Sequence, residues 1–172
     1  ATAHRDAQGA RLFDPNAAAL QHGGVRAIIA LHEGTATPVG VEQHMEWPLP
    51  SMGFSAFAWA AAAYARAGEG WAAIDLLDRP DWTVFADLER DGYFLPTLAM
   101  LADAAHRLGH RGIARLVAER IEPFVACTIL DPGLLYRGAA SHAAGLAAAT
   151  LGDCTAATEL LRDAVDRHRA HG

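Results

Sequence analysis

The sequence predicts an all-α fold in which antiparallel helix pairs stack side by side as a short α-solenoid. Three observations predict it: alanine is by far the commonest residue, apolar residues recur at helical spacing, and a glycine interrupts that pattern three times. Alanine has the highest helix propensity and lets helices approach closely. Hydrophobic residues make up 52% of the 172 residues and charged residues 20%, a balance typical of one folded domain with a substantial core.

The three glycines separate the expected helix pairs. Each of them, Gly68, Gly109 and Gly152, ends one apolar helix and precedes another. Glycine suits this place because the chain commonly turns left-handed after a helix C-terminus. A small residue lies seven positions before each glycine and an alanine five positions after it: Ala61, Ala102 and Gly145, then Ala73, Ala114 and Ala157. These small side chains predict close contact between the two helices of each pair.

This spacing of small residues, glycine and alanine resembles the tetratricopeptide repeat, and Tyr64 falls at the aromatic position of that repeat's first helix. The period is longer than the family's because connections intervene at 78–92 and 123–138. The alanine-rich end of the chain is similar to the C-terminal helical arrays of large actinobacterial regulators. Those include LuxR-type ATPase regulators and multidomain proteins related to nucleotide cyclases. The resemblance covers residues ~50–172.

The expected elements follow in order. A helix over 16–33 begins after Asp14-Pro15, and a short one over 39–46 stops at Trp47-Pro48. The helices of the first pair cover 52–67, with Ser51 as its cap, and 71–77, which ends before Pro80. The remaining pairs cover 94–108 with 111–121, and 139–151 with 154–168. We therefore predict one domain, with divergent helices over 1–50 and three hairpins over 51–172.

The sequence also allows predictions for one extended segment and for the tryptophan and cysteine side chains. Residues 124–130 favour an extended conformation, but one strand makes no sheet, so no sheet is predicted. Trp59 and Trp71 belong to the first hairpin and are expected in the core. Trp47 and Trp82 flank proline-containing connections, where capping of the array or contact with a partner is an alternative. Both cysteines, Cys127 and Cys154, are expected to be buried and reduced.

The composition argues against several functions. The net charge is −6 and the arginines are scattered, so direct nucleic-acid binding is not expected. No apolar stretch is long enough to span a bilayer. His106 and His110 have the spacing of two metal ligands on one helix, but Gly109 is expected to end the helix between them. The run Glu42, His44 and Glu46 is assigned to a polar face. We expect neither a metal nor a cofactor.

No catalytic motif is recognisable in the sequence. The chain contains no nucleophile elbow, phosphate-binding loop or dinucleotide fingerprint. Ser141 and His142 are adjacent, and adjacent residues of a helix point in different directions, so they do not make a nucleophile and its base. The acidic run Asp87, Glu89 and Asp91 is expected to be a solvated connection. The chain is therefore predicted not to be an enzyme.

Candidate binding residues follow from the resemblance. In tetratricopeptide arrays the first helix of each pair lines a concave groove. The matching polar positions are Ser55, Arg66, Asp103, His106, Arg107, His142 and Thr150. We select Arg66, Asp103, His106, Arg107 and His142 as the binding residues, because arginine suits carboxylates on a partner peptide and Asp103 can orient it.

The expected function is that of a non-catalytic, cytoplasmic helical-repeat module. It would bind a protein or peptide, or other domains of a larger bacterial regulator, since the chain starts without Met in a polar segment. Stacked hairpins present extended surfaces suited to this role. The alternative is a small-molecule sensor with an apolar pocket between helices, lined by Phe54, Phe57, Tyr64, Tyr93 and Phe94.

Overall fold

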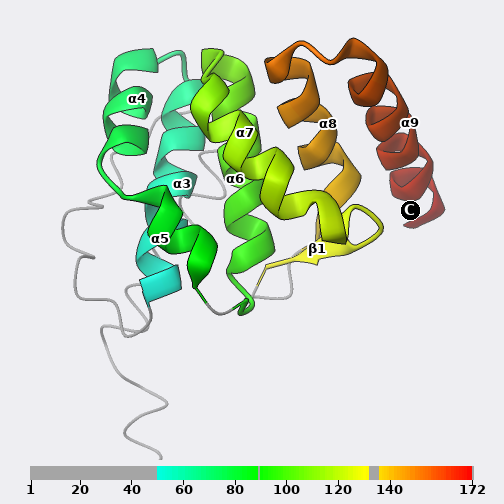
Figure 1. Ribbon diagram of the computed structural model, residues 1–172, viewed down its shortest axis with the longest axis horizontal. Coiled ribbons are helices and arrows are strands. Elements are labelled where there is room, and N and C mark those ends of the chain that lie inside the picture. The colour runs from blue at the N-terminus through cyan, green and yellow to red at the C-terminus, as the bar shows by residue number, and fades with distance from the viewer. Residues whose placement is uncertain (1–49, 89, 132–135, 172) are drawn as a thin grey trace, which may run out of the picture.

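The computed structural model describes residues 50–88, 90–131 and 136–171 (Figure 1). This part of the chain is mostly helical, which confirms the all-α prediction in its coarse form. The elements are α3 (Pro50–Arg66), α4 (Gly70–Asp78), α5 (Trp82–Asp87), α6 (Phe94–Leu108), α7 (Arg111–Ile121), a short 3₁₀ helix (Glu122–Phe124), β1 (Thr128–Leu130), β2 (Tyr136–Ala139), α8 (Ala140–Leu151) and α9 (Cys154–His171). The bounds of α6 and α7 are those predicted from the sequence.

Several expectations lie outside the described residues. These are the helices over 16–33 and 39–46, the cluster Glu42, His44 and Glu46, and Trp47. Within the described part, no helix is both long and apolar enough to cross a membrane.

The three turn glycines adopt the left-handed conformation that the sequence predicts. Their φ angles are 83° at Gly68, 67° at Gly109 and 90° at Gly152. After each glycine the next amide reaches back to the last turn of the preceding helix, as in the bond from the His110 N–H to the Ala105 carbonyl at 2.9 Å. This pattern satisfies carbonyl groups that the helix end would otherwise leave without partners.

Small residues lie where the helices of each pair meet. Ala61, Ala102, Ala73 and Ala114 are fully buried, and Ala157 is nearly so. At Gly145 the contact is closest, because an added Cβ would lie 2.7 Å from the Leu161 Cγ atom. The predicted close approach of helices within each hairpin is therefore confirmed.

The connection over 78–92 contains α5, which the sequence analysis did not predict. Asp81 caps this helix, accepting the Thr83 N–H at 3.0 Å. Trp82 and Phe85 are buried, and their rings pack with Phe54 and with Phe94 to form an aromatic cluster. The Trp82 indole Nε1 donates to the Leu77 carbonyl at 2.6 Å, which satisfies its one polar group. This cluster fills the end of the first two hairpins.

Three smaller predictions are wrong. Trp71, expected in the core, is 87% exposed at the start of α4. Cys127 and Cys154, expected to be buried, are both exposed. Ser51 does not cap its helix: α3 begins at Pro50, two residues before the predicted start, and the buried Ser51 hydroxyl donates to Asp91. Asp91 thus belongs to a packing contact in addition to the polar connection predicted for it.

The connection over 123–138 forms a β-hairpin, which contradicts the prediction that no sheet is present. β1 and β2 are antiparallel, with Thr128 opposite Ala139 and Ile129 opposite Gly138, and the register shifts after Ile129. Strands of three and four residues are too short to show an alternating apolar pattern. Ile129 is buried and anchors the hairpin to the helices.

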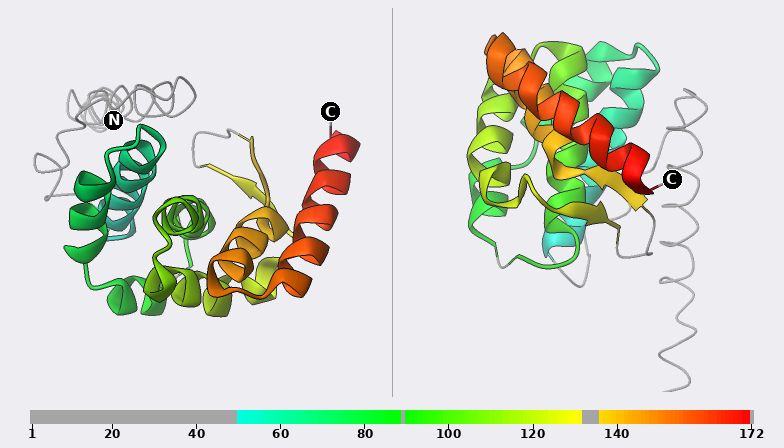
Figure 2. Two further views of the ribbon diagram at one scale, coloured as in Figure 1. Left: turned by 90° about the horizontal axis from the view of Figure 1, so that it is seen from above. Right: turned by 90° about the vertical axis from the view of Figure 1, so that its right-hand side faces the viewer.

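The helices follow one another in a row. α6 packs between α3 and α8, while α4, α7 and α9 each pack against the first helix of their own hairpin. The β-hairpin contacts α6, α8 and α9, and Figure 2 shows it on the side of α6 away from α7. The hairpin therefore lies against the face where α3, α6 and α8 come together.

Candidate functional site

A pocket of about 150 Å³ lies where α3, α6 and α8 meet the β-hairpin. Its wall combines apolar side chains with guanidinium, carboxylate, imidazole and phenol groups. The lining residues are Arg66, Ala99, Met100, Asp103, Ile129, Tyr136, Arg137, Ala139, His142, Ala143 and Leu146. Convergence of several polar groups on one concavity makes this pocket the candidate site.

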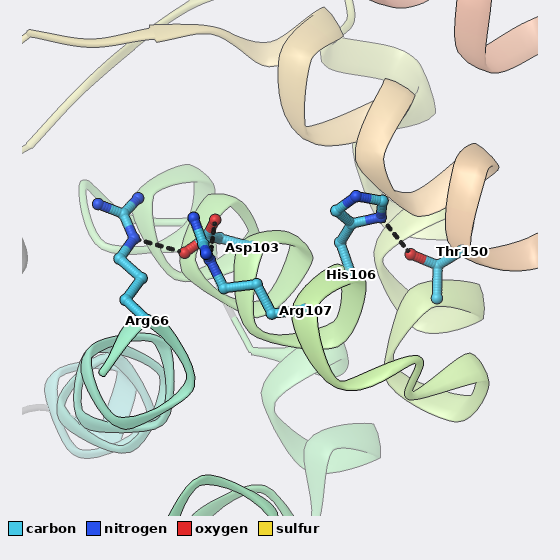
Figure 3. A network of polar contacts seen from close by, with 5 residues as sticks. All are labelled: Arg66, Asp103, His106, Arg107 and Thr150. Carbon is cyan, nitrogen blue, oxygen red and sulfur yellow. Dashed lines mark hydrogen bonds and ion pairs between the residues drawn. The ribbon is translucent and has the colours of Figure 1, made fainter. Parts of the chain in front are cut away.

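Asp103 joins the first two hairpins at the pocket. Its Oδ2 accepts a hydrogen bond from Arg66 Nε at 2.7 Å, and its Oδ1 accepts one from Arg107 Nε at 3.1 Å (Figure 3). Arg66 is the last residue of α3, and Arg107 lies one turn after Asp103 on α6. The Asp103 side chain is only 13% exposed. A carboxylate shared in this way orients both guanidinium groups.

Two neighbours, Asp131 and Trp59, hold Arg137 in place. Its Nε and Nη2 both donate to Asp131 Oδ2, at 3.2 and 2.8 Å. Its Cζ atom lies 3.8 Å from the centre of the Trp59 ring, in cation–π contact. The side chain is only 10% exposed, and desolvation is the main reason that its pKa falls below the ordinary value. Asp131, Arg137 and Trp59 thus attach the hairpin to α3.

Two histidines lie next to each other at the edge of the pocket, and His142 lines it. The ring centres of His142 on α8 and His168 on α9 are 6.1 Å apart. The Ala139 N–H donates to His168 Nε2 at 2.9 Å, so this nitrogen carries no proton. Tyr136 packs edge-on against His168 at 6.0 Å. The His168 ring thereby ties the end of α9 to β2.

Desolvation lowers the pKa of His142, and the neighbouring His168 lowers it further. Arg66 and His106 act in the same direction, while Asp103 opposes them. The residue is exposed as a whole, while its ring lies at the pocket and beside His168. Its neutral form is therefore favoured near neutral pH.

The structure brings together three of the five predicted binding residues. Arg66, Asp103 and His142 line the pocket, and Arg107 lies beside it through its bond to Asp103. His106 does not line it. Its Nδ1 lies 3.2 Å from Thr150 Oγ1, which itself donates to the Leu146 carbonyl, so His106 donates to Thr150 (Figure 3). The binding role of all five residues remains a prediction.

The concave positions predicted for the first helix are only partly exposed. Ser55 is 5% exposed, and its neighbours Ala58 and Ala62 on α3 are fully buried. The α3 helix packs against α6. The prediction that Ser55 lies in an open groove is therefore wrong. Only the last turn of α3, at Arg66, reaches the pocket.

Sequence reasoning missed the residues that the hairpin contributes. Tyr136, Arg137 and Asp131 lie in a segment interpreted as a connection, and His168 ends the helix predicted over 154–168, where no role was assigned to it. The sequence does mark this segment with Gly138, whose φ of 108° is rare for other residues. Without a predicted sheet, that glycine carried no indication of where the neighbouring arginine lies.

The chemistry of the site is that of ionic recognition. Arg66, Arg107 and Arg137 carry three positive charges, and Asp103 and Asp131 carry two negative charges, which leaves one positive charge at neutral pH. In the part of the chain that the structure describes, no three histidine, cysteine or acidic residues gather as metal ligands would. An anionic group is thus the ligand class that the side chains favour.

His106 and His110 illustrate why the spacing of two histidines is weak evidence for a metal site. Gly109 ends α6 between them, as predicted, and His110 caps α7 by accepting the Ile113 N–H at 3.2 Å. The two rings therefore have separate structural contacts.

Comparison of the chain with protein-family models, curated proteins and solved structures finds no match.

Proposed function

We propose that this chain is a non-catalytic helical-repeat module of the tetratricopeptide type, which binds a protein or peptide through the pocket between α3, α6, α8 and the β-hairpin. In this proposal the three hairpins form a short α-solenoid within a larger cytoplasmic regulator. The partner is either another protein or another domain of that regulator. A part of the C-terminal helical array of an actinobacterial LuxR-type or cyclase-related regulator fits this description.

The observation that carries the proposal is the convergence of Arg66, Asp103 and His142 from the first helices of three successive hairpins. These residues lie far apart in the sequence, and adjacent first helices place them on one face. Arg66 and Arg107 are both oriented by Asp103 before any partner arrives. Preorganised donors reduce the entropy cost of binding.

The size of the pocket favours a side chain over a free cofactor. Pockets for drug-sized ligands usually occupy about 300–1,000 Å³, and this one is about 150 Å³. It therefore suits one acidic residue of a longer chain, whose other residues would contact the surrounding surface. The alternative of a sensor with an apolar pocket has weaker support, because Phe54 and Phe94 pack into the aromatic cluster instead of lining a cavity.

The proposal can be tested without a known partner. The immobilised 172-residue chain is used to select from a random peptide library, and the affinity of enriched peptides is measured by fluorescence anisotropy. Arg66→Gln and Arg107→Gln are each expected to weaken binding about tenfold or more, as loss of a charged hydrogen bond does. Arg115→Gln is the matched control, since Arg115 is exposed on α7 and does not line the pocket.

Circular dichroism and thermal melting would establish that each variant is folded. If folded Arg66→Gln and Arg107→Gln bind as the unchanged protein does, the concave pocket is rejected and the convex face or the helix ends become the candidates. Failure to enrich any peptide over an unrelated helical protein would reject peptide binding itself.

A further inference from the structure

The pocket contains two guanidinium groups whose positions are set by different parts of the fold. Arg66 comes from the end of α3, and Arg137 comes from β2 of the hairpin. Both line the pocket, and the positive charge of Arg66 disfavours the charge on Arg137. Two like charges in a partly buried place repel. Asp103 and Asp131 offset part of this repulsion, and an anion between the two arginines would offset it further.

Arg137 is also equipped to donate further. Of the five N–H donors of a guanidinium, the Nε and Nη2 atoms serve Asp131, and within the described residues Arg137 makes no other hydrogen bond. Trp59 covers one face of the group, so its plane is fixed. A fixed planar donor is well suited to a planar carboxylate.

Much of the rest of the pocket wall is apolar and suits the methylene groups of a small carboxylate. Ala99, Met100, Ile129, Ala143 and Leu146 supply apolar surface next to the charged groups. A cavity of about 150 Å³ holds a molecule the size of benzene. A carboxylate with one or two methylene groups has comparable dimensions, whereas a nucleotide does not fit.

His142 stands next to this anion position. The groups that face it are Arg66 from α3, Asp103 and His106 from α6, Tyr136 and Arg137 from β2, and His168 from α9. Apart from Asp103, no group among these stabilises a proton on the ring. His168 already has a structural contact of its own, because its Nε2 accepts the Ala139 N–H.

We infer that the pocket binds a single carboxylate between Arg66 and Arg137, and that His142 takes up a proton as the carboxylate binds. This inference rests on the proposed function in its choice of site, and it specifies the ligand chemistry and a dependence on pH. The net charge of the chain is −6, so the local pair of arginines and the added proton, not the overall field, would attract the anion.

The test is an NMR titration of the whole chain. The His142 ring signals, assigned by their loss in His142→Asn, are followed against pH in sodium acetate and in sodium chloride of equal ionic strength. Acetate is expected to raise the pKa of His142. With the affinity expressed per ionised acetate, it should be constant below the free-state pKa of His142, fall about tenfold per pH unit between the free and bound values, and level off above them.

Variants separate the pocket from the rest of the surface. Arg66→Gln and Arg137→Gln should each weaken acetate binding about tenfold or more. Arg66→Gln is easier to interpret than Arg137→Gln, because Arg137 also attaches the β-hairpin to α3. His142→Asn should abolish the pH dependence, and His110→Asn, at the start of α7 and outside the pocket lining, should retain it. Equal acetate effects in the unchanged and arginine variants would overturn the inference.

Two probes distinguish the source of the carboxylate. Acetate represents a free small acid, and a capped Ala-Glu-Ala peptide represents an acidic side chain in a protein. Stronger binding of the peptide supports a protein ligand, and equal binding supports a free acid at the same pocket. If neither probe shifts His142, the inference fails even when library peptides bind. If acetate shifts His142 but no peptide is enriched, the proposed function fails and the inference stands.

Discussion

At the scale of single residues, Gly138 and His168 show how a close contact constrains the sequence. The chain at Gly138 has a φ of 108°, and an added Cβ would lie 2.6 Å from His168 Nε2. A side chain here would meet both backbone strain and a steric clash. The glycine therefore permits the bond between the Ala139 N–H and His168, which joins α9 to the hairpin.

The first prediction concerns the pH dependence contributed by His142. Desolvation, followed by the neighbouring His168, lowers the pKa of this residue in the folded chain below its ordinary value of 6.5. The unfolded chain then binds the proton more tightly. The free energy of unfolding should decrease as pH falls below about 6.5 and become constant below the folded-state pKa, as far as this group is concerned.

Urea denaturation at about pH 8 and about pH 5.5 would measure this effect. His142→Asn should lose less stability on acidification than the unchanged protein, and His110→Asn, which keeps a capping side chain at the start of α7, should lose as much. An identical loss in His142→Asn would mean that folding does not shift this pKa.

The second prediction concerns Arg137→Lys. Lysine retains the charge but not the planar group that stacks on Trp59 and offers two donors to Asp131. The free energy of unfolding should decrease by about 1–2 kcal/mol. Arg79→Lys is the control, because the Arg79 pair with Asp75 is exposed on α4 and its neighbouring turn. Chemical denaturation measures both variants, and equal stability would reject the role of the stacked arginine.

At the scale of elements, each helical hairpin combines a local turn with a close contact between its helices. Gly152 supplies the left-handed turn between α8 and α9. Seven residues earlier, Gly145 is buried against Leu161. A glycine inside a helix costs stability relative to alanine, so its presence here indicates that the contact leaves no room for a methyl group.

The third prediction tests that contact with Gly145→Ala. Alanine would favour the helix by about 0.5–1 kcal/mol, but its Cβ would lie 2.7 Å from Leu161 Cγ and 3.3 Å from the Leu161 backbone nitrogen. The strain should dominate, for a net loss of about 1–2 kcal/mol in the free energy of unfolding.

A double-mutant cycle with Leu161→Ala, measured by denaturation, isolates the steric term. The two substitutions together should cost less than the sum of their separate effects. A gain in stability in Gly145→Ala alone would show that α8 and α9 are further apart than described.

At the scale of the whole molecule, Asp103 connects helices from two hairpins. It accepts from Arg66 on α3 and from Arg107 on its own helix, and its side chain is largely covered. Bridges of this kind hold neighbouring hairpins in one register, in addition to the apolar packing of α3 against α6.

The fourth prediction is that Asp103→Asn lowers the free energy of unfolding by about 1 kcal/mol, since the amide oxygen is uncharged and the arginines remain partly exposed. Asp75→Asn, which alters an exposed pair at α4, should change stability by much less. Thermal denaturation compares the two, and equal effects would contradict a bridging role for Asp103.

The local features of this chain were predictable from its sequence. The glycine turns at Gly68, Gly109 and Gly152, the bounds of α6 and α7 and the small residues between paired helices depend on propensities and contacts close along the chain. Among the predicted binding residues, Arg66, Asp103 and His142 share a pocket because α6 packs between α3 and α8.

Only the tertiary structure decided which residues far apart in the sequence come into contact. A hairpin of short strands leaves no periodic pattern, so the approach of Arg137 to Trp59 was not visible in the sequence. The exposure of Trp71 and the burial of Trp82 depend on how α4 and α5 turn about their axes. Helix propensity is a property of neighbouring residues, whereas rotation and register between elements follow from packing of the whole molecule.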